Sequence, residues 1–254
     1  MTALVLLHGM TSSGRAWDDL LPELSRHHRV HTPTALGHRG REPVTNRVTL
    51  TDVVDDAERY LDAHGLHRPH VAGHSLGGYI ALELARRGRA ETVTAISPAG
   101  FWSPSDGTAG QVTHGLRRGA RVARATRPLA KLLVSTARGR RTWMGAAVHR
   151  PERMPAAAAR DVIDDNAACT LADWLFLGDD AVVAPMDPLP CPITVAWAQF
   201  DDVLPLAQYE SAVRTRLPGA RFVVIAGAGH AAMVDERESV ERIILETISD
   251  SGLP

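Results

Sequence analysis

The feature that most constrains the fold is the segment Gly73-His74-Ser75-Leu76-Gly77, which stands between a strand-like run and a helix-like run. A serine on such an abrupt turn has a strained backbone, and the chain passes itself only where the residues two positions away are small. Gly73 and Gly77 meet that requirement. We predict that the Ser75 hydroxyl stands above a sheet beside the first helical amides, Leu76 N–H foremost, which can stabilise developing negative charge. The alternative is a glycine-rich turn that merely contains a serine.

Strand-like runs alternate with helix-like patterns along most of the chain. The clearest helix is Thr51–His64, where apolar residues recur at helical spacing behind a Thr49/Asp52 capping box. The alternation predicts an α/β fold with βαβ crossovers and a parallel sheet covered on both faces. The strand-like runs are Ala3–Leu7, Arg29–Thr32, His70–Ala72, Thr92–Ser97, Ile193–Ala198 and Phe222–Ala226.

The interval 101–190 breaks this rhythm. It holds no strand-like run, only Arg- and Ala-rich stretches followed by an apolar helical pattern through Leu171, Trp174 and Leu175. We predict a helical insertion over 101–190 and a core made of residues 1–100 and 191–254.

Composition excludes several classes of protein. With 254 residues, 44% hydrophobic and 22% charged, the chain is neither disordered, collagenous nor a coiled coil. Its net charge of -1 gives no global attraction to nucleic acid. The two cysteines lie in no ligand-like cluster, so we expect neither a disulfide framework nor a metal site. Without a basic leader or a membrane-spanning apolar stretch, we expect a cytoplasmic protein.

A serine nucleophile needs a base, and the base needs an orienting acid. His230 follows the strand-like run Phe222–Ala226 on a loop of small residues. Asp201 and Asp202 follow the run Ile193–Ala198, although a solvated turn or a helix cap is an alternative role for them. The chain order serine, aspartate, histidine is typical of hydrolases that carry a nucleophile on this kind of turn.

The first strand-like run ends in His8-Gly9-Met10. Gly9 permits a backbone turn that would aim the Met10 N–H at the same oxyanion as Leu76 N–H. We also expect His8, Gly9 and His74 to line the substrate site.

Together these segments resemble the α/β-hydrolase superfamily, in its serine-nucleophile, lid-bearing branch, over nearly the whole chain. The resemblance implies an α/β-hydrolase fold with a helical lid and no cofactor. The segment Trp197–Pro205 resembles a family motif that contains the acid. Aligned with that motif, Asp201 is the acid, with Asp202 as the fallback. The matching segments are Leu6–Gly9, Trp17, Leu20–Pro22, Gly37–Gly40, Gly73–Gly78, Trp197–Pro205 and Gly229–His230.

Three features depart from the family pattern. The first strand begins at residue 3, so the usual opening hairpin is missing and a sheet of about six parallel strands is left. Ala198 replaces the glycine usual before the acid, and Thr34 stands where the following loop usually has an aspartate.

The resemblance implies a serine hydrolase that cleaves a carboxylic ester or thioester of a small to medium apolar acyl or aryl substrate. The catalytic residues would be Ser75, His230 and Asp201, with Met10 and Leu76 as the oxyanion hole. The same scaffold also serves C–C hydrolases, lactonases, haloperoxidases, acyltransferases and low-turnover ligand receptors. An aspartate in place of Ser75 would instead have suggested epoxide or haloalkane hydrolysis.

The family places its lid at the insertion. Candidate apolar walls for the substrate are Phe101, Trp102, Trp143 and Trp174, although each could instead pack the lid core. Nine basic residues and no acid lie between Arg117 and Arg141, and Arg117, Arg121 and Arg124 share a helical face. This face is either simply solvated or a docking site for an anionic carrier, such as an acyl carrier protein.

Overall fold

The structure of the protein is a computed structural model that describes residues 1–103, 107–178 and 181–250. Its centre is a six-stranded sheet in the order β2-β1-β4-β5-β7-β8, and every neighbouring pair is parallel. This confirms the predicted parallel sheet of about six strands. The strands are β1 (Ala3–Leu7), β2 (Arg29–His31), β4 (His70–His74), β5 (Thr92–Ile96), β7 (Ile193–Phe200) and β8 (Arg221–Gly229).

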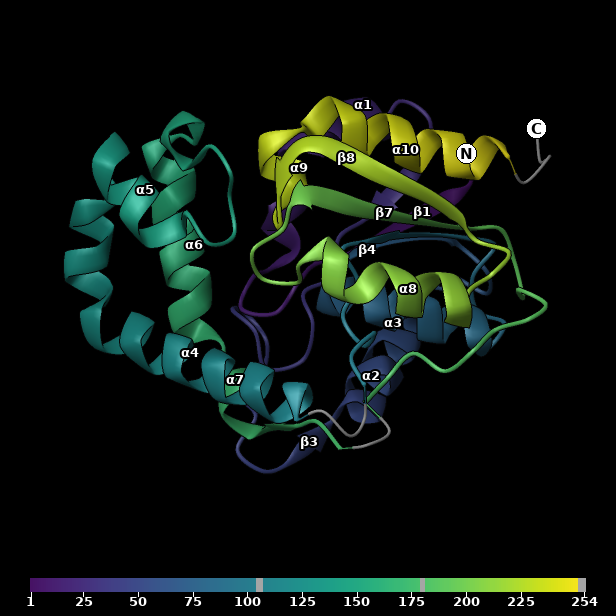
Figure 1. Cartoon of the computed structure of the whole chain (residues 1–254), viewed down its shortest axis with the longest axis horizontal. Coiled ribbons are helices and arrows are strands. Elements are labelled where there is room, and N and C mark those ends of the chain that lie inside the picture. The colour runs from purple at the N-terminus through teal and green to yellow at the C-terminus, as the bar shows by residue number, and fades with distance from the viewer. Residues whose placement is uncertain (104–106, 179–180, 251–254) are drawn as a thin grey trace.

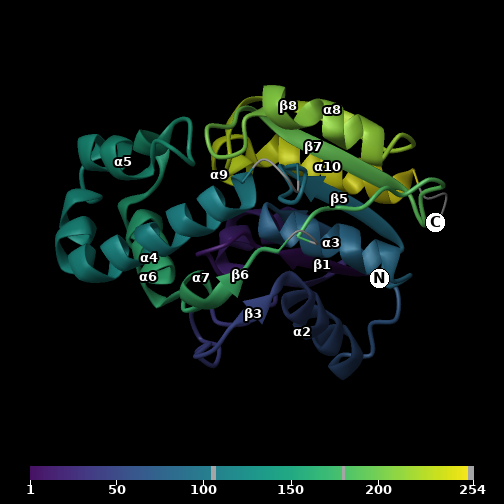
Figure 2. The same ribbon diagram turned by 60° about the horizontal axis from the view of Figure 1, so that its bottom comes forward.

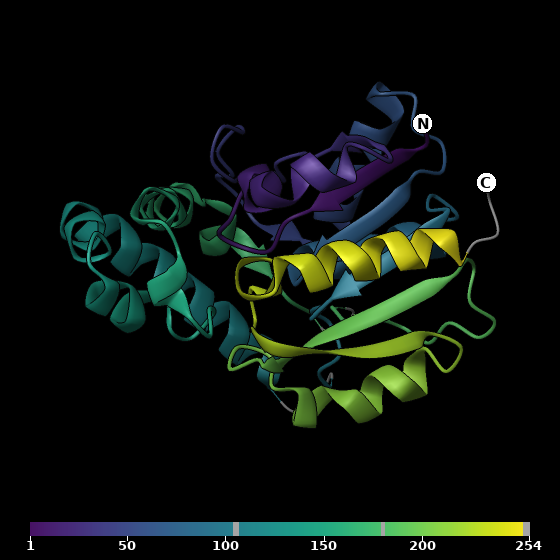
Figure 3. The same cartoon turned by 90° about the horizontal axis from the view of Figure 1, so that it is seen from above.

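Helices cover both faces of the sheet, as Figures 1 and 3 show. The predicted capping box at Thr49 and Asp52 opens α2. On one side lie α2 (Leu50–Ala63), α3 (Leu76–Arg86) and α8 (Leu206–Arg216). On the other side lie η1 (Gly14–Leu20), α1 (Leu21–Leu24), α9 (Ala232–Asp235) and α10 (Arg237–Ser249).

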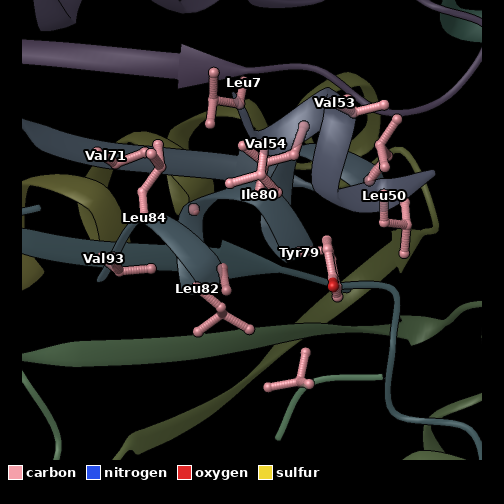
Figure 4. Close-up of a cluster of buried hydrophobic side chains, with 14 of the residues drawn as sticks. Leu7, Leu50, Val53, Val54, Val71, Tyr79, Ile80, Leu82, Leu84 and Val93 are labelled. Atoms are coloured by element: carbon pink, nitrogen blue, oxygen red, sulfur yellow. The ribbon is translucent and has the colours of Figure 1, made fainter. Parts of the chain in front are cut away.

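Two apolar clusters fill the space between the sheet and these helices. Figure 4 shows part of the first, where Val54 of α2 and Ile80 of α3 pack near Val71 of β4. The second places the fully buried Trp17 and the inner face of α10 against the opposite side of the sheet. The central strands β4 and β5 are buried along their whole length, as expected of a parallel sheet with two covered faces, although β5 includes the polar Thr92 and Thr94.

The chain enters the sheet at β1, adds β2 on one side and then crosses to β4 on the other. The carboxyl ends of β1 and β4 therefore meet where the strand order reverses, which is where open α/β sheets bind ligands. Ser75 directly follows β4, and His8 directly follows β1.

A helical insertion separates β5 from β7 and projects from one end of the sheet (Figures 1 and 2). It has an apolar cluster of its own around Val134, Met144 and Ile163. Its elements are α4 (Thr108–Leu133), α5 (Ala137–Met144), η2 (Pro151–Arg153), α6 (Ala156–Ala168), α7 (Leu171–Trp174) and β6 (Leu175–Phe176).

One expectation for this interval is wrong. The strand β6 pairs in parallel with β3 (Val48–Thr49), so the interval is not free of strands, and the helical pattern ends at Trp174. A two-residue strand is too short to show the alternation by which strands are recognised in a sequence. The boundaries at 101 and 190 stay a prediction, and residues at both margins, such as Trp102 and Val183, pack in the main core.

Polar contacts attach the insertion to the core at several places, two of which involve buried or partly buried aspartates. Ser13 Oγ donates to Asp165 Oδ2 over 2.6 Å, and Arg39 Nη1 donates to Asp165 Oδ1 over 3.0 Å. On the other side of the insertion, Asp235 accepts hydrogen bonds from the backbone amides of His149 and Arg150.

Within the described parts of the chain, none of the helices is both long and apolar enough to cross a membrane.

Replacing Asp235 tests the second attachment. Its carboxylate also accepts from Gly229 N, so Asp235→Ala leaves three backbone donors without their partner. We expect the free energy of unfolding to fall by about 2 kcal/mol, measured by urea denaturation. The exposed Asp19→Ala is the control and should change it by less than about 0.5 kcal/mol. An equal effect of both substitutions would contradict this role.

Candidate active site

Ser75 has the strained backbone that its sequence context predicts. Its φ of 54° and ψ of -113° lie outside the regions that side chains usually adopt. Its backbone is held from several directions, because Ser75 N donates to Ile96 O over 2.9 Å and Ser75 O accepts from Tyr79 N and Ala99 N. The surrounding strand and helix thus fix a conformation that the residue alone would avoid.

The two glycines around Ser75 are required by close backbone contacts. A Cβ on Gly73 would overlap the carbonyl of Gly77, and a Cβ on Gly77 would overlap the carbonyl of Leu7. The turn is therefore pressed both against itself and against the end of β1. This is the close passage that the sequence predicts, and it sets the height of Ser75 above the sheet.

His230 and Asp201 lie together, in the loops that follow β8 and β7. Asp201 Oδ2 is 2.8 Å from His230 Nδ1, and the Asp201 side chain has no exposed surface. The other oxygen, Oδ1, accepts from the backbone amides of Val203 and Leu204 over 3.0 and 2.7 Å. The neighbouring Asp202 is exposed. Of the two candidate acids, the structure thus brings Asp201 to the histidine.

The ring of His74 packs on the ring of His230, with centroids 4.6 Å apart and planes at 57°. Burial and the neighbouring His230 lower the pKa of His74 well below its ordinary value. A neutral imidazole of the serine turn therefore contacts the ring of His230.

Gly9 lies close to this group, but for a reason other than the predicted one. A Cβ there would come within 2.8 Å of His74 Nδ1 and 3.2 Å of Ser75 Cβ, so Gly9 is needed for close approach. The positive φ in this turn, 62°, belongs to Thr11. Met10 thus lies between Gly9, which is in close contact with His74 and Ser75, and the strained Thr11. Leu76 is the first residue of α3, where the backbone amides of the first turn have no acceptor within the helix.

His8 and His38 form hydrogen bonds with the backbone on either side of Met10, at Gly9 and Thr11. Ala35 N donates to His8 Nε2 over 3.0 Å and Thr11 N donates to His38 Nε2 over 3.2 Å, so both rings are acceptors at Nε2. Their Nδ1–H groups donate to the carbonyls of Gly9 and Leu36 respectively. His38 is a site residue that was not predicted, although it lies in the segment Gly37–Gly40 that carries part of the family resemblance.

These two rings stay neutral over a wide pH range. They meet edge to face with centroids 4.8 Å apart. Burial, helped by His38, lowers the pKa of His8 to about 3, and burial lowers the pKa of His38 to about 4. Protonation of either ring would remove the acceptor of a backbone amide.

The four aromatic residues predicted to line a substrate pocket are not grouped together. Phe101 and Trp102 are buried in the main core, and Phe101 packs edge-on against Trp197. Trp143 packs against the insertion's own cluster, while Trp174 is 44% exposed. Their role in substrate binding stays a prediction.

The insertion contacts the histidine loop directly. Ala231 N donates to Ala147 O over 2.7 Å, and the ring of His149 stacks on Phe200 at 4.3 Å. Asp235, which accepts from the same stretch of the insertion, was missed in the sequence because a lone aspartate after His230 forms no recognisable pattern. No three His, Cys, Asp or Glu residues gather as a metal site in the described ranges.

Comparison with known proteins shows the family. The sequence profile of the alpha/beta hydrolase family matches residues 4–243, so the chain belongs to that family.

Several of its relatives are hydrolases. The chain is 29% identical over 203 residues to epoxide hydrolase EphH of Mycobacterium tuberculosis, covering 78% of this chain and 94% of that protein. It is 28% identical over 263 residues to a pimeloyl-[acyl-carrier protein] methyl ester esterase of Aromatoleum aromaticum, covering 96% and 97%. Among solved structures, a thermophilic esterase from Thermogutta terrifontis superposes with a TM-score of 0.70 at 25% identity, covering 99% and 90%. These relatives support a hydrolase.

A single methyl group tests the serine turn. Gly73→Ala places a Cβ against backbone that cannot move freely, so we expect it to cost at least about 2 kcal/mol of unfolding free energy. The control is Gly115→Ala in α4, where nothing lies within 4 Å of the new Cβ, and helix propensity should add about 1 kcal/mol of stability. Urea unfolding measures both, and a Gly73→Ala protein as stable as the parent would contradict the close passage.

The buried histidines predict a loss of stability in acid. Their folded pKa lies below the unfolded value of 6.5, so between about pH 6 and 4 the unfolded chain binds protons that the folded chain does not, and stability falls with pH. His38→Gln keeps an acceptor for Thr11 N but cannot titrate. We expect the decline in unfolding free energy from pH 5.5 to 4.5 to be smaller by about 1 kcal/mol than in the parent. Parallel curves for the two proteins would show that His38 is not held neutral.

Proposed function

We propose that this protein is a serine hydrolase that cleaves a carboxylic ester or thioester with a small to medium apolar acyl or aryl group. The observation that carries the proposal is the buried pair of Asp201 and His230, 2.8 Å apart, at the same edge of the sheet as the strained Ser75. A base oriented by a buried carboxylate is what a serine hydroxyl needs to act as a nucleophile.

In the proposed reaction, His230 takes the Ser75 proton as the oxygen attacks the substrate carbonyl. The N–H groups of Leu76 and Met10 donate to the resulting oxyanion. Asp201 keeps the Nδ1 proton on His230 and stabilises the imidazolium that forms. His230 then protonates the leaving group, and a water activated by the same ring hydrolyses the acyl-enzyme.

Serine chemistry favours an acyl substrate over the epoxide named for one relative. Attack of a serine oxygen on an epoxide carbon would leave an ether, which has no carbonyl for water to attack. An acyl-serine has one, so the second half of the cycle can proceed. The esterases among the similar proteins agree with this choice.

We further propose that the insertion acts as the lid of this site. Its support is the backbone contact between Ala147 and Ala231, one residue beyond His230, and the bonds from Asp235 to His149 and Arg150. Phe101, Trp102, Trp143 and Trp174 remain the proposed apolar walls.

Three substitutions test the proposed roles, with p-nitrophenyl butyrate as the substrate. Ser75→Ala should lower kcat by at least about 10⁴-fold, and Asp201→Asn by about 10⁴-fold because the imidazole loses its orienting carboxylate. The matched control, Asp202→Asn, should stay within about twofold, as surface substitutions usually do. Equal losses in the two asparagine variants, or turnover by Ser75→Ala, would refute the assignment.

A further inference from the structure

The long helix α4 has two chemically different sides. On its inner side, Arg117 donates to Leu175 O over 3.0 Å and Arg124 donates to Asp173 over 2.6 Å. Arg121 lies 3.7 Å from the same aspartate, but its side chain is 71% exposed. Two of the three arginines that the sequence groups as a docking face therefore bind the insertion itself.

The outer side of α4 carries an apolar stripe. Val122, Leu129, Leu132 and Leu133 are 45%, 55%, 68% and 41% exposed. Leu129 lies seven residues after Val122, and Leu132 and Leu133 lie three and four residues after Leu129. These spacings keep the four side chains on one side of a helix. The buried residues of α4, among them Ala120 and Ala130, are mostly small. The four bulkier side chains of the stripe are exposed, whereas Leu116 packs against the main core.

Only positive charge accompanies this stripe. Residues 107–151 include ten Arg and Lys and no Asp or Glu. The exposed Arg118 lies one turn before Val122, and Arg121 borders the stripe. The acids that pair with α4, Asp164 and Asp173, belong to α6 and α7 and keep only 9% and 23% of their side chains exposed.

We propose that this outer face of α4 binds the surface of a lipid bilayer that contains anionic lipids. The stripe, Val122, Leu129, Leu132 and Leu133, would enter the boundary between headgroups and acyl chains, and Arg118 and Arg121 would contact the phosphates. Because the stripe runs along one side of a single helix, all four of its side chains can contact a planar surface at once. Since the whole chain has a net charge of -1, the attraction is local and orients the insertion toward the membrane. This inference is independent of the proposed reaction.

Vesicle flotation of the full chain tests the proposal. The vesicles are phosphatidylcholine alone or phosphatidylcholine with about 30% phosphatidylglycerol, which supplies the negative surface potential. We expect binding to the anionic vesicles only, and weaker binding in high salt. The variant Arg118→Gln/Arg121→Gln should bind roughly 25-fold more weakly, at about fivefold per arginine. Leu129→Gln/Leu132→Gln should bind at least about tenfold more weakly.

Matched substitutions elsewhere serve as controls. Val224→Gln on β8 and Arg26→Gln remove a side chain of similar exposure, 46% for Val224 and 73% for the Arg26 side chain, and should leave vesicle binding unchanged. All variants should unfold at the parental temperature, because the replaced side chains are on the surface. Absence of binding to anionic vesicles, equal binding to both vesicle types, or equal loss in the controls would overturn the proposal.

Two other occupants of the stripe give distinct results. If light scattering shows a dimer that Leu129→Gln/Leu132→Gln converts to a monomer, a second copy of the chain covers the stripe and the proposal is wrong. If an acyl carrier protein binds this face while anionic vesicles do not, the proposal is equally wrong, and the predicted carrier is the occupant.

Discussion

The arrangement of this site depends on one steric constraint, the contact of the serine turn with the end of the neighbouring strand. Gly77 lies so close to the Leu7 carbonyl that no Cβ fits between them, and Gly73 lies equally close to Gly77. These contacts join the carboxyl ends of β1 and β4, so Ser75, Gly9 and His74 lie close together. The strained φ of Ser75 is maintained because the packed sheet and α3 leave the backbone no alternative.

Neutral histidines surround this contact. His8, His38 and His74 are buried, and burial lowers the pKa of each, so none carries a charge at neutral pH. The first two accept hydrogen bonds from the backbone amides of Ala35 and Thr11. The ring of His74 packs at a tilt against the ring of His230, which is paired with the Asp201 carboxylate. The site thus combines one imidazole that is paired with a carboxylate and three buried imidazoles that are neutral.

The parallel sheet, the serine turn and the residues at the strand ends could be predicted from the sequence, because each leaves a local pattern. The glycines around Ser75 follow from local sterics, and the strand β1 was predicted with its observed bounds. What could not be predicted depends on distant contacts. The pairing of β3 with β6 spans two residues in each strand. Two of the three amides that donate to Asp235, those of His149 and Arg150, lie far away in the chain. The basic face of α4 was predicted from the sequence, but its pairing with acids was not, because those acids lie on other helices.

The central claim is that Ser75 forms a covalent intermediate, and mass spectrometry after treatment with a fluorophosphonate measures it most directly. We expect one adduct per chain on the peptide that contains Ser75, formed in the parent and in Asp202→Asn but far more slowly in Asp201→Asn. Labelling of a different residue, or no labelling of a folded protein, would contradict the account.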